Sequence, residues 1–285
     1  MTRISWIRTL CIVMLTIFLV PQSIDAAKKE PVTEKIVFIP HDSRPISNKQ
    51  TVDVVRRTGY DVIVPPTELL GNREDWGHPD ALWTWLDENL AQPGVKAAVI
   101  SSDAMIYGSL VGSRKHSYTR AQVLTRAARF DDVQRAYPKT PLYVFGSIMR
   151  TPRSGEASGH EEPEYYRRYG ADIFRYTVLR DKEEVEGLSR RERKEYDFLG
   201  RLIPQEALAD WMGRREKNYA VNEYLIDLLR KRNTFRYLTL GRDDNAPFSQ
   251  THLESRYLSA AGADLGKTRF QTMAGIDEIA LLMLT

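Results

Sequence analysis

Short apolar runs alternate with longer amphipathic runs from Lys35 onward, and this alternation constrains the fold more than any other feature of the sequence. Short apolar runs are typical of buried parallel strands, and the amphipathic runs between them are typical of the helices that connect such strands. The pattern predicts strands at residues 35–40, 61–64, 95–100, 142–145, 237–240 and 270–273. We therefore expect an α/β fold, a parallel sheet of repeated βα units that either stays open or forms an incomplete barrel.

Helix signals lie between the predicted strands. Ser47 with Gln50, and Thr119 with Gln122, have the spacing of a capping box, and Pro79 suits the first turn of a helix. Residues 161–233 form a long, charged and mostly helical stretch, which predicts a helical insertion between strands four and five. The tyrosines in that stretch are expected to pack the insertion against the sheet, with a ligand-stacking surface as the alternative.

The first 26 residues have the layout of a signal peptide. Arg3 and Arg8 precede an uncharged run from Thr9 to Val20, and a short polar stretch ends at Ala26, after which we expect cleavage. At about 1.5 Å per residue this run is too short to cross a hydrocarbon core of roughly 30 Å as a helix. We expect a polar leader at 27–34, a secreted or cell-envelope location, and membrane attachment only through an uncleaved signal segment.

Composition excludes several classes of protein. Cys11 is the only cysteine and lies in the predicted signal peptide, so catalysis by cysteine, a disulfide framework and a zinc–thiolate site are excluded from the mature chain. The formal net charge is +3 with acids and bases interleaved, which argues against a nucleic-acid partner. Residues 35–285 are expected to form a single domain. Its apolar run at 279–284 has nothing after it to cover it, which predicts a C-terminal truncation.

Polar residues gather directly after the predicted strands. In parallel α/β folds, ligands bind beyond the carboxyl ends of the strands. The residues at or beyond these ends that we expect to form one site are Asp42, Arg44, Asp103, Tyr107, Arg114, Arg150, Asp243 and Asp244. Arg215, Asn218 and Asn222 share one face of the helix before strand five, where the amides either bind sugar hydroxyls or lock the loop that carries Asp243.

The adjacent Asp243 and Asp244 cannot point the same way on an extended chain. One is expected to face the site and to protonate a leaving oxygen, while the other caps the next helix. Asp103 needs a partner at its strand end, for which Arg44, Arg114 and Arg150 are candidates. Asp42 supplies either a second carboxylate or only an Asx turn.

These residues predict a hydrolase that uses paired carboxylates on a carbohydrate or cell-envelope polymer. The predicted catalytic residues are Asp243, Asp244, Asp103 and Asp42, and the predicted substrate-binding residues are Arg44, Tyr107, Arg114, Arg150, Asn218 and Asn222. Neither the H-E-x-x-H, P-loop nor G-x-S-x-G spacing occurs, so no cofactor or metal is expected, although a hard cation on three of the aspartates is an alternative. The expected partner is a small molecule or glycan. Two other hypotheses are a noncatalytic envelope ligand-binding protein and an inactive fragment of a longer enzyme.

Five ordered motifs resemble a known family. They are IPHDSRP at 39–45, PPTELLG at 65–71, SSDAMIYGSLVGSR at 101–114, REKNYAVN at 215–222 and GRDDNAP at 241–247. Together they resemble the bacterial family known as domain of unknown function 4127, over Lys35 to Thr285. The resemblance implies that the chain is the N-terminal part of a longer family member and indicates which residues belong together, but it implies no reaction. Ser109 and Ser249 stand where the resemblance implies glycine, which concerns backbone shape more than chemistry.

Overall fold

The computed structural model describes residues 34–154 and 161–284, and all six predicted strands occur in it. The predicted signal peptide, residues 27–33 of the leader and Cys11 lie outside the described residues. The strands are β1 (Lys35–Ile39), β2 (Asp61–Ile63), β3 (Val95–Ser101), β4 (Leu142–Ile148), β5 (Tyr237–Arg242) and β6 (Phe270–Ala274). β4 and β5 run two or three residues further than their apolar cores predicted.

The strands form one parallel sheet in the order β2-β1-β3-β4-β5-β6. β2 and β6 are its two edges, so the sheet is open and the incomplete-barrel alternative is wrong. The chain order reverses at β1, which lies between β2 and β3, and such a reversal opens a crevice at the carboxyl edge of a parallel sheet. All described residues belong to one compact unit.

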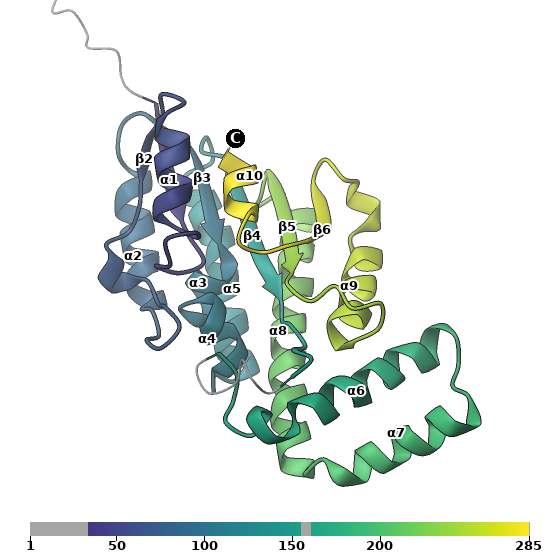
Figure 1. Ribbon diagram of the computed structural model, residues 1–285. Coiled ribbons are helices and arrows are strands. Elements are labelled where there is room, and N and C mark those ends of the chain that lie inside the picture. The colour runs from purple at the N-terminus through teal and green to yellow at the C-terminus, as the bar shows by residue number, and fades with distance from the viewer. Residues whose placement is uncertain (1–33, 155–160, 285) are drawn as a thin grey trace, which may run out of the picture. The chain divides into compact units, whose positions relative to one another are not determined.

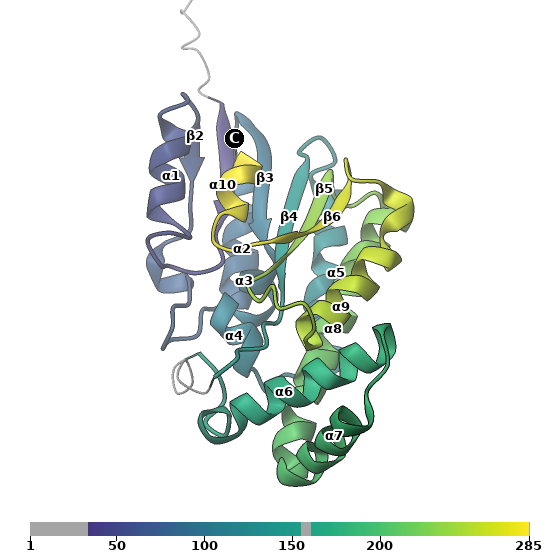
Figure 2. The ribbon, with the colours of Figure 1, turned by 45° about the vertical axis from the view of Figure 1, so that its right-hand side comes forward.

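Helices cover both faces of the sheet (Figures 1 and 2). The helices are α1 (Lys49–Arg56), α2 (Pro79–Leu90), α3 (Ser102–Tyr107), α4 (Leu110–Lys115), α5 (Arg120–Ala136), α6 (Tyr166–Val185), α7 (Arg190–Leu202), α8 (Gln205–Arg232), α9 (Gln250–Ala261) and α10 (Ile279–Leu284), with 3-10 turns η1 (Thr67–Leu69) and η3 (Ala263–Leu265). Thr119 and Gln122 form the predicted capping box of α5, and Pro79 begins α2. The capping box predicted at Ser47 is wrong, because a turn from Arg44 to Asn48 delays α1 until Lys49.

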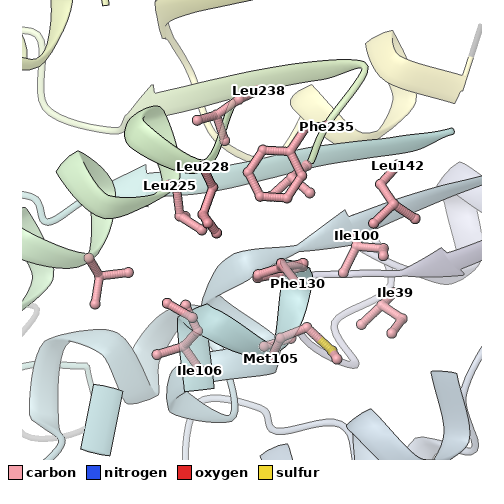
Figure 3. Close-up of a cluster of buried hydrophobic side chains, with 14 of the residues drawn as sticks. Ile39, Ile100, Met105, Ile106, Phe130, Leu142, Leu225, Leu228, Phe235 and Leu238 are labelled. Atoms are coloured by element: carbon pink, nitrogen blue, oxygen red, sulfur yellow. The ribbon is translucent and has the colours of Figure 1, made fainter. Parts of the chain in front are cut away.

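Successive strand residues point to opposite cores. Val37 and Ile39 of β1 contribute to the larger core, together with α2, α3, α5 and α8. Figure 3 shows this core, where Ile100 lies near Phe130, whose ring meets that of Phe235 edge-on with centroids 5.4 Å apart. Ile36 and Phe38 face the smaller core beneath α1 and α10. This alternation of buried side chains is what a strand covered by helices on both faces requires.

The apolar run at the end of the sequence forms α10. Ile279, Ala280 and Leu284 are buried in the smaller core, whereas Leu282 is exposed. Half of the residues in this run are thus buried without any later segment, because the run itself packs on the sheet. Within residues 34–154 and 161–284, no helix has the length and apolar character needed to span a membrane.

The predicted insertion between β4 and β5 consists of α6, α7 and α8 and lies beyond the carboxyl end of the sheet (Figure 2). Its aromatic side chains pack mainly between helices rather than against the sheet. Tyr166 and Trp211 are fully buried in a core of their own, and Tyr176 stacks on Tyr196 with ring centroids 4.6 Å apart. The C-terminal half of α8 is the part that reaches the sheet, through residues such as Leu225.

Candidate active site

The carboxyl ends of β1, β3, β4 and β5 bring the predicted residues to one edge of the sheet. β3 passes directly into α3, which places Asp103 in the first turn of a helix capped by Ser101. The sequence analysis identified no helix here, because α3 and α4 are too short to show a helical period. Gly108 ends α3 with a φ of 99°, a left-handed conformation that favours glycine.

His41 is the partner of Asp103, not one of the predicted arginines. Nδ1 of His41 lies 2.9 Å from Oγ of Ser101 and 3.1 Å from Oδ2 of Asp103, and Ser147 donates a hydrogen bond of 3.0 Å to Oδ1. The approach to Oδ2 is off the hydrogen-bond axis. Oδ2 of Asp103 and Nε2 of His41 are both buried and have no hydrogen-bond partner among the described residues. Because a carboxylate only accepts, Nδ1 is inferred to hold the proton, which leaves the Nε2 lone pair for chemistry.

Asp42 lies next to His41 and is fully buried. Its Oδ1 accepts from the backbone N–H of Arg44, which is the Asx turn that the sequence allowed, and its Oδ2 accepts from Nε of Arg44 at 2.9 Å. The same guanidinium reaches Asp277 at 3.1 Å. Burial opposes the charge on Arg44, but Asp42 and Asp277 together raise its pKa. Asp42 therefore holds Arg44 at the edge of the site.

Arg114 and Arg150 converge on Glu161, a residue that sequence reasoning missed. Nη1 of Arg114 lies 3.2 Å and Nη2 of Arg150 lies 2.9 Å from Oε2 of Glu161, and Nε of Arg73 lies 3.0 Å from Oε1. Burial raises the pKa of Glu161, but Arg150, Arg114, Arg73 and Arg44 outweigh it, so the pKa is lowered overall. Three guanidinium groups from separate segments thus hold one ionised carboxylate.

Glu162 has the opposite electrostatic environment. Its side chain is buried and accepts from Nε of Arg150 at 2.8 Å, and its Oε2 has no hydrogen-bond partner in the described part of the chain. Burial raises the pKa of Glu162 more than Arg114 and Arg150 lower it. Adjacent carboxylates with pKa values pushed apart were expected at Asp243 and Asp244, but Glu161 and Glu162 are the pair that shows this feature.

Asp243 and Asp244 diverge, as the extended chain required. The Asp243 side chain is 49% exposed, and its Oδ2 lies 3.7 Å from guanidinium nitrogens of both Arg114 and Arg150. Asp244 accepts from the backbone N–H of Ala246 in an Asx turn. It does not cap the next helix, because Ser249 caps α9. Asp243 is therefore the aspartate that faces the arginines.

The polar stripe on α8, formed by Arg215, Asn218 and Asn222, holds the segments that carry the candidate site. Oδ1 of Asn218 accepts from Nε2 of His116 at 2.8 Å, and Nδ2 of Asn218 donates to the Ser113 carbonyl oxygen. Asn222 donates to the carbonyl oxygen of Ser147. Arg215 is buried and forms an ion pair with Glu254. It also donates to the carbonyl oxygens of Met149 and Arg150. The stripe thus fixes α4 and the end of β4, not the loop of Asp243. Both amides are buried and bonded to the protein itself.

Tyr107 also lies inside the protein. It is 3% exposed, its ring stacks on His116 with centroids 4.8 Å apart, and burial, with Asp103 nearby, raises its pKa well above the usual value. Its position indicates packing beneath the site. Burial likewise lowers the pKa of His116 to about 4, although the hydrogen bond with Asn218 opposes this change.

The low pKa of His116 predicts acid sensitivity. An unfolded histidine titrates near 6.5, so between pH 6.5 and 4 the unfolded chain binds a proton that the folded chain refuses, and stability falls as pH falls. The free energy of unfolding should drop by about 3 kcal/mol over this window from His116 alone. Urea unfolding at pH 7.5 and 4.5 should show a smaller loss for His116→Gln than for the wild type. His78→Gln, at an exposed imidazole, is the control and should behave like the wild type; an equal loss in all three proteins would contradict the prediction.

No group of three or more His, Cys, Asp or Glu side chains suited to a metal ion occurs in the described ranges. The three aspartates considered for a hard cation have different partners: Asp42 contacts Arg44, Asp103 contacts His41, and Asp243 faces Arg114 and Arg150. Each of these aspartates thus has its own histidine or arginine partner, and the three do not form one such group in the described ranges.

Comparison with protein families agrees with the five sequence motifs. The model of the family described as Protein of unknown function (DUF4127) matches residues 36–285. The chain belongs to this family. The DUF4127 match starts one residue into β1 and occupies the C-terminal part of this chain. A comparison with curated proteins gives no significant match.

The DUF4127 motifs meet in space. Motifs 39–45, 101–114 and 241–247 supply His41, Asp103 and Asp243, and motif 215–222 supplies the supporting stripe. Motif 65–71 holds motif 39–45 in place, because the Gly71 carbonyl oxygen accepts from the backbone N–H of Ser43. At the two departures from the expected family pattern, Ser109 and Ser249, the backbone is extended and the serine caps a helix, so glycine is not required.

Three side chains of the candidate site of this DUF4127 member were not among the predicted site residues. His41 lies two residues after β1, and its position near a strand end was a usable signal. Glu161 and Glu162 follow no strand, and nothing in their local sequence distinguishes them from other charged residues of the insertion. They contact Arg114 and Arg150 only in the folded chain, where the start of the insertion lies against α4 and the segment after β4.

Proposed function

We propose that this chain is a hydrolase that acts on a carbohydrate or related polymer of the cell envelope. The observation that carries the proposal is the position of Asp243, an exposed carboxylate 3.7 Å from two guanidinium groups at the edge of the sheet that also holds His41 and Asp103. An exposed carboxylate beside cations that can orient a substrate, with a second carboxylate nearby, is the pattern that glycoside hydrolysis uses.

The geometry favours particular roles for these groups. A carboxylate flanked by two cations suits stabilisation of positive charge at the reacting carbon better than proton donation, so Asp243 takes the first role. Asp103 and His41 are both buried, and Nε2 of His41 has no hydrogen-bond partner in the described part of the chain. In this proposal Nε2 takes a proton from the attacking water and passes it to the leaving oxygen. Arg114 and Arg150 orient the substrate. Four buried residues hold these groups in position and do not contact the substrate: Asp42, Tyr107, Asn218 and Asn222.

A noncatalytic ligand-binding protein is the second candidate, and one observation favours it. Arg44, Arg114 and Arg150 all have carboxylate partners inside the protein, as expected of a site that exchanges one anion for another without chemistry.

Separate replacement of Asp243 and Asp244 by asparagine tests the hydrolase. Purified protein is incubated with cell-wall and glycan digests, and newly formed reducing ends are measured. Asp243→Asn should abolish product release while its unfolding curve stays that of the wild type. Asp244→Asn, which keeps the carbonyl oxygen that its turn needs, is the matched control and should retain activity. Full activity in both variants, or no turnover of any digest by the wild type, would refute the proposal.

A further inference from the structure

Four arginines surround the carboxylate of Glu161, and we call Arg44, Arg73, Arg114 and Arg150 the arginine cluster. Arg44 follows β1, Arg73 lies in the loop before α2, Arg114 lies in α4, and Arg150 follows β4. Three of them contact Glu161 directly at 2.9–3.2 Å. Three segments far apart in the sequence thus present guanidinium groups to one carboxylate, and Arg44 adds positive charge at longer range.

The cluster contains cations that need an anion. Arg114 is only 3% exposed, and burial together with the nearby charge of Arg150 lowers its pKa. A buried guanidinium without a close counter-ion costs several kcal/mol, and the other carboxylate that faces Arg114, that of Asp243, lies at 3.7 Å, so negative charge at the Glu161 position is favoured. Glu161 fills it here with a side chain that is 17% exposed and therefore open to exchange with solvent species.

We infer that Glu161 occupies the binding position of a substrate carboxylate, and that the site takes a uronic acid residue of an acidic glycan. The carboxylate of the sugar replaces that of Glu161 between Arg73, Arg114 and Arg150. This inference rests on the proposed function, since it names the substrate class of the same site.

The arrangement favours a carboxylate over a phosphate. Glu161 presents one oxygen to Arg73 and the other to Arg114 and Arg150, which is the two-oxygen pattern of a planar carboxylate. The additional oxygens of a phosphate would face Asp243 and Glu162, which already contact the same guanidinium of Arg150. A uronic acid exchanges one negative charge for one, so the charge balance of the cluster is kept.

An internal occupant weakens binding, because a ligand must compete with it for the same position. Glu161→Gln removes the competing charge and keeps the size of the side chain. Titration calorimetry with glucuronate should therefore show at least about tenfold tighter binding to Glu161→Gln than to the wild type. Glucose, which lacks the carboxylate, should bind both proteins equally weakly, and inorganic phosphate should bind less tightly than glucuronate. The control is Glu195→Gln, which removes a similar arginine-paired glutamate from the remote pair with Arg175 and should leave glucuronate binding unchanged.

A second variant keeps the inference testable if Glu161→Gln does not fold. Glu161→Asp keeps the negative charge but shortens the side chain, so it should preserve the fold, hold the arginines less closely and bind glucuronate several-fold more tightly than the wild type. Equal glucuronate affinity in the wild type, Glu161→Gln and Glu161→Asp would overturn the inference, and so would a preference for phosphate over glucuronate.

The binding measurement is independent of turnover. If glucuronate binds as expected but no digest is cleaved, the proposed hydrolase fails and the carboxylate site stands as that of a binding protein. If neutral glycans are cleaved and glucuronate binds no tighter to Glu161→Gln, the hydrolase stands and the substrate assignment fails.

Discussion

Replacing Arg215 by alanine is expected to lower the free energy of unfolding by about 3 to 5 kcal/mol. Arg215 is 1% exposed and forms a two-bond ion pair with Glu254, at 2.8 Å and 2.7 Å. It also donates to the carbonyl oxygens of Met149 and Arg150. The variant would leave a carboxylate buried without its cation and two carbonyl oxygens without their donor, and both changes carry desolvation costs.

Urea unfolding of Arg215→Ala gives the measurement, and Arg175→Ala supplies the matched control. Arg175 makes the same two-bond contact with Glu195, but its side chain is 41% exposed, so its loss should cost less than about 1 kcal/mol. The double variant Arg215→Met with Glu254→Leu should recover much of the lost stability, because no buried charge is then left unpaired. A loss below about 1 kcal/mol for Arg215→Ala would show that the ion pair does not hold the end of β4 in place.

Replacing Asp103 by asparagine is expected to lower turnover by about 10³- to 10⁴-fold, if the chain is the proposed hydrolase. The Asp103 carboxylate lies 3.1 Å from Nδ1 of His41, and its charge favours the tautomer with the proton on Nδ1, which leaves Nε2 free to take a proton. An asparagine amide can donate to Nδ1 instead, which moves the proton to Nε2 and blocks it as a base. The carbonyl oxygen of asparagine can still accept from Ser147, so the fold should survive.

Two measurements separate this positioning role from simple destabilisation. The unfolding curve of Asp103→Asn should match that of the wild type, and the loss should appear in kcat and not in KM, because the arginine cluster that binds the substrate is intact. Asp87→Asn, at an exposed position on α2, is the control and should retain full turnover. Unchanged activity in Asp103→Asn would remove His41 from the mechanism.

The strands and their parallel arrangement were predictable because burial on both faces leaves a continuous apolar run, and burial of β1, β3, β4 and β5 is nearly complete beyond their first residues. Their last residues were not predictable. Ser147 and Arg242 are polar but still pair with the neighbouring strand, so hydrogen bonding carries the sheet past the end of the apolar pattern.

Strand ends also predicted which part of the protein holds the polar cluster, since consecutive parallel strands share one carboxyl edge. Asp42, Asp103, Arg150 and Asp243 do meet there. Their partners were not predictable, because a pairing such as His41 with Asp103 joins residues 62 positions apart and depends on which strands are neighbours.

Sequence alone thus determined the α/β class, the order of the elements, the DUF4127 relationship and the edge of the sheet where charge collects, because hydrophobic periodicity and local turn chemistry are properties of neighbouring residues. Only the tertiary structure decided that the sheet is open and that Glu161 lies among the arginines. It also decided that the polar stripe on α8 holds α4 and the end of β4 and leaves no amide free for a ligand among the described residues. Those outcomes depend on packing and on ion pairs between segments that are distant in the sequence. These interactions form only when the chain folds and brings the segments together.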